Sequence, residues 1–188
     1  MTDAPPPDPR ESVFRQLYAE LYPEVLRFVA RRCHPSHAED VTSEIFVVAW
    51  RRYEQLPADS GERRAWLFGV GYKLLANTRR GDQRREALVV RMAETVALVD
   101  PGTHPDLVAT RVDLVRAWGR LRAIHQEALA LSLWDGLSAA EAAHVLGISA
   151  TAYRLRLSRA RRALRAHMSS TARPRALAGD PALQGEFR

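Results

Sequence analysis

The stretch "GLSAAEAAHVLGISATAYRLRLSRARRALR", residues 136–165, contains two helical patterns that meet at a glycine. Ser138 is followed three residues later by Glu141, a capping-box pattern that marks the start of a helix. Gly147 is expected to end this helix, because glycine readily adopts the left-handed conformation that terminates many helices. Ser149 then caps a second helix. A helix, a tight glycine turn and a second helix together predict a helix-turn-helix motif.

The second of these helices has two distinct faces. Its apolar stripe is expected to pack on the rest of the protein and consists of Tyr153, Leu157, Ala160 and Leu164. The positions outside the stripe are mainly basic and never acidic: Arg154, Leu155, Ser158, Arg159, Arg161, Arg162 and Arg165. A purely positive face repels itself unless it meets a polyanion, and the arginine fork fits phosphates and base edges in the major groove. We therefore predict DNA binding; the alternative is a solvated basic face that holds only counter-ions.

The composition suits a nucleic-acid partner but does not decide the matter. The 188 residues include 28 basic and 22 acidic side chains, and every basic residue except Lys73 is arginine. Arginine is well suited to phosphate and guanine recognition. A GC-rich genome would produce the same bias, so the positions of the arginines matter more than their number.

The composition also excludes several classes of protein. The single cysteine, Cys33, cannot form an internal disulfide or a cysteine-cluster metal site. The N-terminal "MTDAPPPDPR" lacks the basic start and apolar run of a signal peptide. No segment approaches the roughly 18 uninterrupted apolar residues that a membrane span requires. We therefore expect a cytoplasmic protein without a membrane span.

Apolar residues at helical spacing predict further helices over residues 11–33, 36–56, 63–85 and 107–137. Pro23 is expected either to divide the first of these helices or to bend it. Ser36 and Glu39 form a capping-box pattern at the start of the second. The pattern fades between the third and the fourth, where only a short helix is expected, at 87–98.

The chain shows no strand alternation and is therefore expected to be all-α, as two small helical bundles joined by a flexible linker. The expected bounds are a disordered N-terminus at 1–11, a first bundle at 12–85, a linker at 86–106, a second bundle at 107–168 and a disordered tail at 169–188.

A second basic cluster lies in the predicted first bundle. It comprises Arg63, Arg64, Lys73, Arg79, Arg80, Arg84 and Arg85, interleaved with Trp66, Phe68 and Tyr72. Arginines with aromatic residues suit single-stranded or distorted nucleic acid, in which unstacked bases rest on aromatic rings. The alternative, a core tryptophan and phenylalanine with a solvated arginine fringe, stays open.

An acidic helix face precedes this cluster. Glu39, Asp40 and Glu44 share it with the aromatic residues Phe46 and Trp50. In a protein that binds DNA elsewhere, such a face favours a protein partner over DNA. An ordinary solvated helix face is the alternative.

Three motifs together resemble the bacterial sigma factors of the extracytoplasmic-function group, within the sigma-70 family. They are "AEDVTSEIFVVAWRR" at 38–52, "RAWLFGVGYKLLANTRR" at 64–80 and the stretch at 136–165, and the resemblance covers residues 12–168. It implies that the first bundle is similar to sigma region 2 and the second to region 4. The implied function is to bind core RNA polymerase, to direct it to minus-10 and minus-35 promoter elements and to assist DNA melting. Polymerase supplies the bond chemistry, so no enzymatic activity is expected.

The resemblance also implies roles for individual residues. Those at the polymerase β′ clamp-helix position are Asp40, Ser43, Glu44 and Phe46. Those at the minus-10 position are Arg63, Arg64, Trp66, Lys73, Asn77, Arg79, Arg80 and Arg84. Those at the minus-35 position are Ser149, Thr151, Arg154, Leu155, Arg156, Ser158, Arg159 and Arg162. Other implied partners are the polymerase β flap, promoter DNA and, by family habit alone, an anti-sigma factor.

The chain departs from the common family pattern at a few of these positions. Ser43 stands in place of glutamine, Gly69 in place of arginine, and Lys73 in place of asparagine. Tyr153 replaces a small β-branched residue, and Leu155 replaces a serine on the DNA-facing side. Leucine cannot hydrogen-bond a base edge, although it can contact a thymine methyl group. We therefore expect either an unusual promoter preference or weaker binding of region 4 to DNA.

Two other classes fit parts of the sequence. A plain helix-turn-helix regulator that binds duplex DNA without polymerase explains only the C-terminal half. An enzyme is the second alternative, but the six histidines are scattered, and His34 and His37 beside Cys33 make a poor metal site. We therefore expect neither a metal nor a cofactor.

Overall fold

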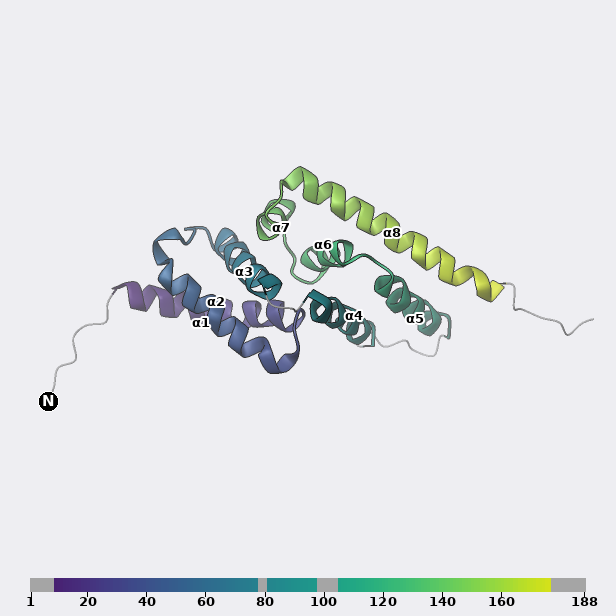
Figure 1. Cartoon of the computed structure of the whole chain (residues 1–188), viewed down its shortest axis with the longest axis horizontal. Coiled ribbons are helices and arrows are strands. Elements are labelled where there is room, and N and C mark those ends of the chain that lie inside the picture. Colours follow the sequence, from purple (N-terminus) through teal and green to yellow (C-terminus); the bar gives the residue numbers. More distant parts are fainter. Residues whose placement is uncertain (1–8, 78–80, 98–104, 177–188) are drawn as a thin grey trace, which may run out of the picture.

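The computed structural model describes residues 9–77, 81–97 and 105–176, and within them the chain is all-α, which confirms the predicted class (Figure 1). The α-helices of this part are α1 (Pro9–Ala30), α2 (Ala38–Arg51), α3 (Ser60–Asn77), α4 (Gly81–Ala97), α5 (Pro105–Gly119), α6 (Ala123–Leu133), α7 (Ala139–Leu146) and α8 (Ala150–Ala176). Short 3-10 helices lie at Pro35–His37 and Tyr53–Gln55. None of the described helices has both the length and the apolar character needed to cross a membrane.

Helices α1, α2 and α3 form the first bundle. Its centre is fully buried, with Val25, Ile45 and Leu67 at 0% exposure. The rings of Phe28 and Phe68 stack at 4.3 Å between α1 and α3. Apolar residues at helical spacing therefore form the core that the sequence predicts.

The first bundle differs from the sequence predictions at the start of α2 but not at Pro23. Helix α1 runs without interruption through Pro23, so the proline does not divide it. The capping box predicted at Ser36 and Glu39 is wrong. Ser36 lies inside the 3-10 helix, where its amide donates to Nδ1 of His34. Helix α2 begins at Ala38, and its N-cap residue, His37, makes no side-chain cap.

Helices α4 to α8 form the second bundle. Trp118, Leu121, Leu129 and Ala160 are buried together, and Met92 of α4 joins them. The short helix expected at 87–98 is thus part of a longer helix that packs on α5 and α6. Helix α4 occupies much of the segment expected to form the linker.

The helix-turn-helix prediction is confirmed in detail. Both hydrogen bonds of the capping box are present, from the Ser138 amide to Oε2 of Glu141 at 2.7 Å and from the Glu141 amide to Oγ of Ser138 at 3.3 Å. Gly147 closes α7 with a φ of 65°, a conformation that favours glycine. Oγ of Ser149 accepts a hydrogen bond from the Ala152 amide at 3.1 Å and caps α8.

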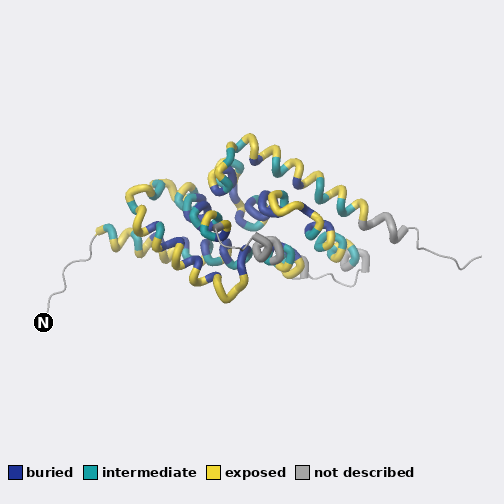
Figure 2. The backbone as a smooth tube through the Cα atoms, viewed as in Figure 1, coloured by how far each residue is buried: buried dark blue, intermediate teal, exposed yellow. Residues whose placement is uncertain are grey.

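The two bundles pack against each other through α3 and α7. Ala142, Ala143 and Val145 of α7 share one buried cluster with Leu67 and Phe68 of α3. Figure 2 shows buried positions, in dark blue, on both sides of this contact. In the described part of the chain the two bundles are therefore in direct contact, an arrangement that we call closed.

Candidate nucleic-acid interface

Helix α8 is fixed to its bundle by its apolar stripe. Tyr153 and Ala160 are buried, and Leu157 and Leu164 are half-buried, as predicted. The hydroxyl of Tyr153 donates a hydrogen bond of 2.9 Å to the carbonyl of Ala128 in α6. Tyrosine at this position therefore has a structural role, since it ties the second helix of the motif to the helix behind it.

The opposite face of α8 is basic and accessible. Among the residues predicted to read the minus-35 element, Arg156 is half-buried and the others are exposed: Ser149, Thr151, Arg154, Leu155, Ser158, Arg159 and Arg162. Within the described residues, none of the arginines between positions 154 and 165 forms an ion pair. Their positive charge is therefore available to an external polyanion.

The pKa of His125 responds to this charge. Burial, followed by the charges of Arg122, Arg156 and Arg159, lowers the pKa of His125 from its ordinary value. DNA phosphates would neutralise these arginines, so we predict that the pKa of His125 rises when duplex promoter DNA binds. A titration followed by NMR of the imidazole protons measures this change.

The exposed ring of His34, which caps the 3-10 helix Pro35–His37 of the first bundle, serves as the control for that measurement. Added salt is expected to raise the pKa of His125 in the free protein as well, because salt screens the arginines. An unchanged pKa of His125 in saturating DNA would contradict binding on this face.

The residues predicted to bind the minus-10 element are not all free on the surface, since some of them form hydrogen bonds or ion pairs within the protein. The guanidinium of Arg63 donates to the carbonyls of Pro57, at 2.9 Å, and Ala58. Arg64 pairs with Glu24 of α1 at 3.3 Å and with Glu141 of α7 at 3.8 Å. Both arginines are thus engaged within the protein in this arrangement.

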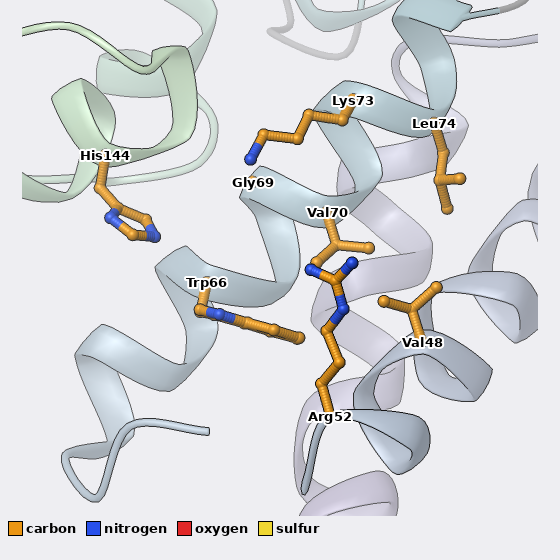
Figure 3. Close-up of a pocket in the computed structure, with 8 residues that line it drawn as sticks. All are labelled: Val48, Arg52, Trp66, Gly69, Val70, Lys73, Leu74 and His144. Carbon is orange, nitrogen blue, oxygen red and sulfur yellow. The ribbon is translucent and has the colours of Figure 1, made fainter. Parts of the chain in front are cut away.

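Trp66 and Lys73 line a cavity of about 270 Å³ between α2, α3 and α7. Figure 3 shows Lys73 and His144 reaching toward the same space from facing helices. Arg52 of α2 also lines this cavity. Trp66 is half-buried there, whereas Phe68 is a core residue at 2% exposure, so only part of the predicted aromatic cluster can meet a ligand.

The remaining minus-10 residues cannot be placed in full. Asn77 is the last residue of α3 and Arg84 lies in α4, but the side chains of both are outside the described part of the chain, as are the whole residues Arg79 and Arg80.

The acidic face of α2 is exposed, as the sequence suggests. Asp40, Ser43 and Glu44 are all accessible. Phe46 is not, because it is 3% exposed and its ring lies 4.7 Å from that of Tyr18. Phe46 therefore packs α2 against α1 and is not part of the exposed acidic face.

Apolar side chains complete this face in place of Phe46. Val47 is 48% exposed and Trp50 is 38% exposed. Sequence reasoning missed Val47, although its spacing of three and four residues from Glu44 and Ser43 places it on the same side of the helix. An acidic face with exposed apolar neighbours is chemically suited to a protein partner.

Sequence reasoning also missed a buried charged network between the bundles. Arg32, at 0% exposure, pairs with Glu127 at 2.9 Å and with Asp135 at 2.6 Å. Arg31 pairs with the other oxygen of Asp135 at 2.7 Å. The partners are about a hundred positions apart along the chain, so no local spacing signals the network.

The residues weighed as a metal site do not come together. Cys33 is buried, and the rings of His34 and His37 are 6.3 Å apart. Within the described residues there is no group of three or more histidine, cysteine or acidic side chains that could hold a metal ion.

Comparisons with known proteins define the class. The family model for sigma-70 region 2 matches residues 17–85, and that for sigma-70 region 4 matches residues 111–164. The RNA polymerase sigma factor CnrH of Cupriavidus metallidurans is 33% identical over 68% of this chain and 71% of its own length. The ECF RNA polymerase sigma factor SigL of Mycobacterium tuberculosis is 31% identical over 82% of this chain and 88% of its own length.

The fold agrees with these matches. A solved structure of CnrH in complex with the cytosolic domain of CnrY aligns with a TM-score of 0.55 at 25% identity, over 85% of this chain and 90% of that one. The chain belongs to the sigma-70 family of RNA polymerase sigma factors. Within that family it is a factor of the extracytoplasmic-function group. The alternative of a plain helix-turn-helix regulator is not favoured, because it leaves the match to region 2 without an explanation.

Proposed function

We propose that α8 reads the minus-35 element by entering the major groove with its basic face. The observation that carries this assignment is the unpaired, exposed arginine face of a capped helix-turn-helix within region 4. The contact residues proposed are Ser149, Thr151, Arg154, Leu155, Arg156, Ser158, Arg159 and Arg162. Their chemistry supports both phosphate contacts and base-edge contacts.

Region 2 is proposed to bind core polymerase and the minus-10 element. The exposed acids Asp40 and Glu44, with Ser43, would meet the β′ clamp helices, and Phe46 would hold α2 in place from behind. The residues proposed for the minus-10 element are Arg63, Arg64, Trp66, Lys73, Asn77, Arg79, Arg80 and Arg84. Trp66 supports capture of an unstacked base, since a tryptophan ring offers a stacking surface.

The remaining assignments follow from the same function. Region 4 would contact the β flap of polymerase, and the factor would act in the cytoplasm without chemistry or cofactors of its own. The relative CnrH forms a complex with the cytosolic domain of CnrY, which supports an anti-sigma partner for this chain. Residues 12–85 and 107–168 are the proposed bounds of the two functional units.

Affinity for core polymerase tests this function directly. We expect the purified protein to form a stoichiometric complex with bacterial core polymerase on size-exclusion chromatography. Duplex DNA binding without any polymerase complex would instead support the plain regulator.

Leu155 gives a more specific prediction about promoter choice. It is 50% exposed on the proposed DNA-facing side and has no hydrogen-bonding group. We predict that Leu155→Ser raises the preference for one base at a single minus-35 position by about fivefold, since one new hydrogen bond is worth roughly 1 kcal/mol. Selection from a library of randomised minus-35 elements measures this preference, with Leu133→Ser, an exposed leucine of α6, as the matched control. Identical base preferences for Leu155→Ser and the unmodified protein would show that Leu155 does not contact bases in the major groove.

A further inference from the structure

The cavity beside Trp66 combines basic side chains with the dimensions of a small-ligand site. Its volume of about 270 Å³ lies near the lower end of the roughly 300–1,000 Å³ that such sites occupy. Arg52 directly after α2, Lys73 of α3 and His144 of α7 all line it (Figure 3). No aspartate or glutamate is among the described residues of its wall. The cavity is therefore electrostatically suited to a small anion.

The three polar side chains of this cavity are accessible to a ligand. Arg52, Lys73 and His144 are all exposed, and none of them forms an ion pair within the described residues. A guanidinium, an ammonium and an imidazole N–H are hydrogen-bond donors that suit phosphate oxygens. The exposed rim of the cavity thus offers donors from three separate elements to one phosphate group.

A neighbouring cavity shows that this positive charge is not a general property of the contact between the bundles. That cavity, of about 350 Å³, also includes His144, but Glu62 and Glu141 line it. No arginine or lysine is among its described lining residues. The two cavities share one histidine and have opposite charge, so only the cavity beside Trp66 fits an anion.

The rest of the wall is aromatic and aliphatic. Trp66 is half-buried, and so are the aliphatic side chains beside it, Val48, Val70 and Leu74. Such a wall cannot bind a phosphate, but a tryptophan ring offers a stacking surface to any flat nucleobase. The cavity therefore has a polar rim for an anion and an apolar wall for an aromatic ring.

Gly69 keeps the space between these two parts open. It lies three residues after Trp66 and four before Lys73, on the same face of α3. A Cβ on Gly69 would lie 3.8 Å from Cδ2 of His144 and 3.8 Å from the Cα of Val145, so a methyl group fits there. A longer side chain would have to project into the cavity.

We propose that this cavity binds a nucleoside monophosphate, with the base stacked on Trp66 and the phosphate held by Arg52, Lys73 and His144. The two parts of the wall match the two ends of such a ligand. The volume suits a single nucleotide and not a longer strand. Arg52 and His144 lie outside the set of residues proposed to meet the minus-10 element, so the site is distinct from that set.

The site has a consequence for promoter binding that rests on the proposed function. Trp66 and Lys73 are also proposed contacts of the minus-10 element, so a bound nucleotide and the minus-10 strand would exclude each other. Nucleotide binding itself requires neither polymerase nor promoter. A chain that binds nucleotide but forms no complex with core polymerase would keep the site and contradict the proposed function.

Calorimetric titration of the full chain, without polymerase or DNA, tests the site. The probes are AMP, GMP, CMP and UMP, each titrated singly, together with the matching nucleosides and inorganic phosphate. We expect at least one of the four nucleotides to bind with a Kd below about 1 mM. Its nucleoside and inorganic phosphate are expected to bind at least about tenfold more weakly, because each makes only half of the contacts. Failure of all four nucleotides to bind would overturn the proposal, and equally tight binding of inorganic phosphate would overturn the role of Trp66.

Arg52→Gln and Arg51→Gln are a matched pair of variants. Both arginines are exposed and each substitution removes one positive charge, but only Arg52 lines the cavity. We expect Arg52→Gln to weaken nucleotide binding by about tenfold or more, because a charge-assisted hydrogen bond is lost. Arg51→Gln is expected to bind within about twofold of the unmodified protein. The same affinity in both variants would mean that the nucleotide is attracted by net charge alone, against the proposal.

Gly69→Leu and Gly69→Ala test the position of the site without a change of charge. Leucine would fill the cavity and is expected to abolish measurable binding, whereas alanine fits the available space and is expected to preserve it. Circular dichroism checks that the helix content of both variants matches that of the unmodified protein. Undiminished nucleotide binding by a folded Gly69→Leu variant would show that the ligand binds elsewhere and would overturn the proposal.

Discussion

Arg159→Glu is expected to lower transcription from a minus-35-dependent promoter by about 100-fold. Loss of one groove contact costs about 1–3 kcal/mol, and the new carboxylate also repels phosphates. Arg159 is exposed on α8 and has no ion-pair partner within the described part of the chain. Transcript yield with saturating core polymerase, and the salt dependence of DNA binding, are the measurements.

Arg120→Glu is the matched control for this prediction. Arg120 is exposed in the turn after α5, outside the DNA-reading face, and the substitution changes net charge by the same amount. We expect Arg159→Glu to make the slope of log affinity against log salt concentration shallower by about one or more, the change that corresponds to the loss of one phosphate contact. Equal losses in the two variants would show that net charge, rather than the α8 face, drives binding.

Asp40→Arg combined with Glu44→Arg is expected to weaken binding to core polymerase by at least about 100-fold. Close charge pairs across interfaces contribute about 1.5–7 kcal/mol, and reversal converts attraction into repulsion. Both carboxylates are exposed on α2, next to Val47. Competition against a labelled wild-type factor for core polymerase measures the change.

Glu20→Arg combined with Glu54→Arg provides the same change in net charge elsewhere on region 2. Both of these glutamates are exposed and lie outside α2. We expect the control to bind polymerase within a few-fold of the wild-type affinity, because surface charges away from a contact contribute little. If the control binds as weakly as the α2 variant, the acidic face is not the polymerase contact.

Local patterns predicted the helix-turn-helix well because its determinants lie within a few residues of one another. The capping box joins Ser138 to Glu141, and Gly147 terminates the same helix at a left-handed conformation. The stripe through Tyr153 and Ala160 is likewise a matter of helical period. Such features require only propensity and spacing, so the second bundle and the basic face of α8 could be anticipated.

Features that depend on tertiary contacts could not be anticipated in the same way. Phe46 is buried because Tyr18 of α1 lies against it, and helical period alone gives no information about which neighbour covers a given face. The capping box predicted at Ser36 failed because the Ser36 amide donates a hydrogen bond to the His34 side chain within a 3-10 helix. Such a local side-chain interaction competes with the helix cap. The network around Arg32 joins residues too far apart in sequence for any motif to report it.

The closed packing of regions 2 and 4 is the largest difference from a picture based on sequence alone. The faded pattern between the bundles predicted a flexible linker, yet α3 of region 2 packs directly on α7 of region 4. Alanine-rich α7 also gave no sign that its Ala142 and Ala143 would share a core with Phe68. Small residues on a short helix are compatible with either surface exposure or close packing, and only the partner helix decides between them.

Transcription in vitro tests the central claim most directly. The purified factor would be added to bacterial core polymerase and a pool of genomic promoter fragments, and the 5′ ends of the transcripts would be sequenced. We predict specific start sites that share upstream elements at the minus-10 and minus-35 positions, and loss of those starts with Arg159→Glu but not with Arg120→Glu. No specific starts from a factor that still binds duplex DNA, and no complex with core polymerase, would contradict the account.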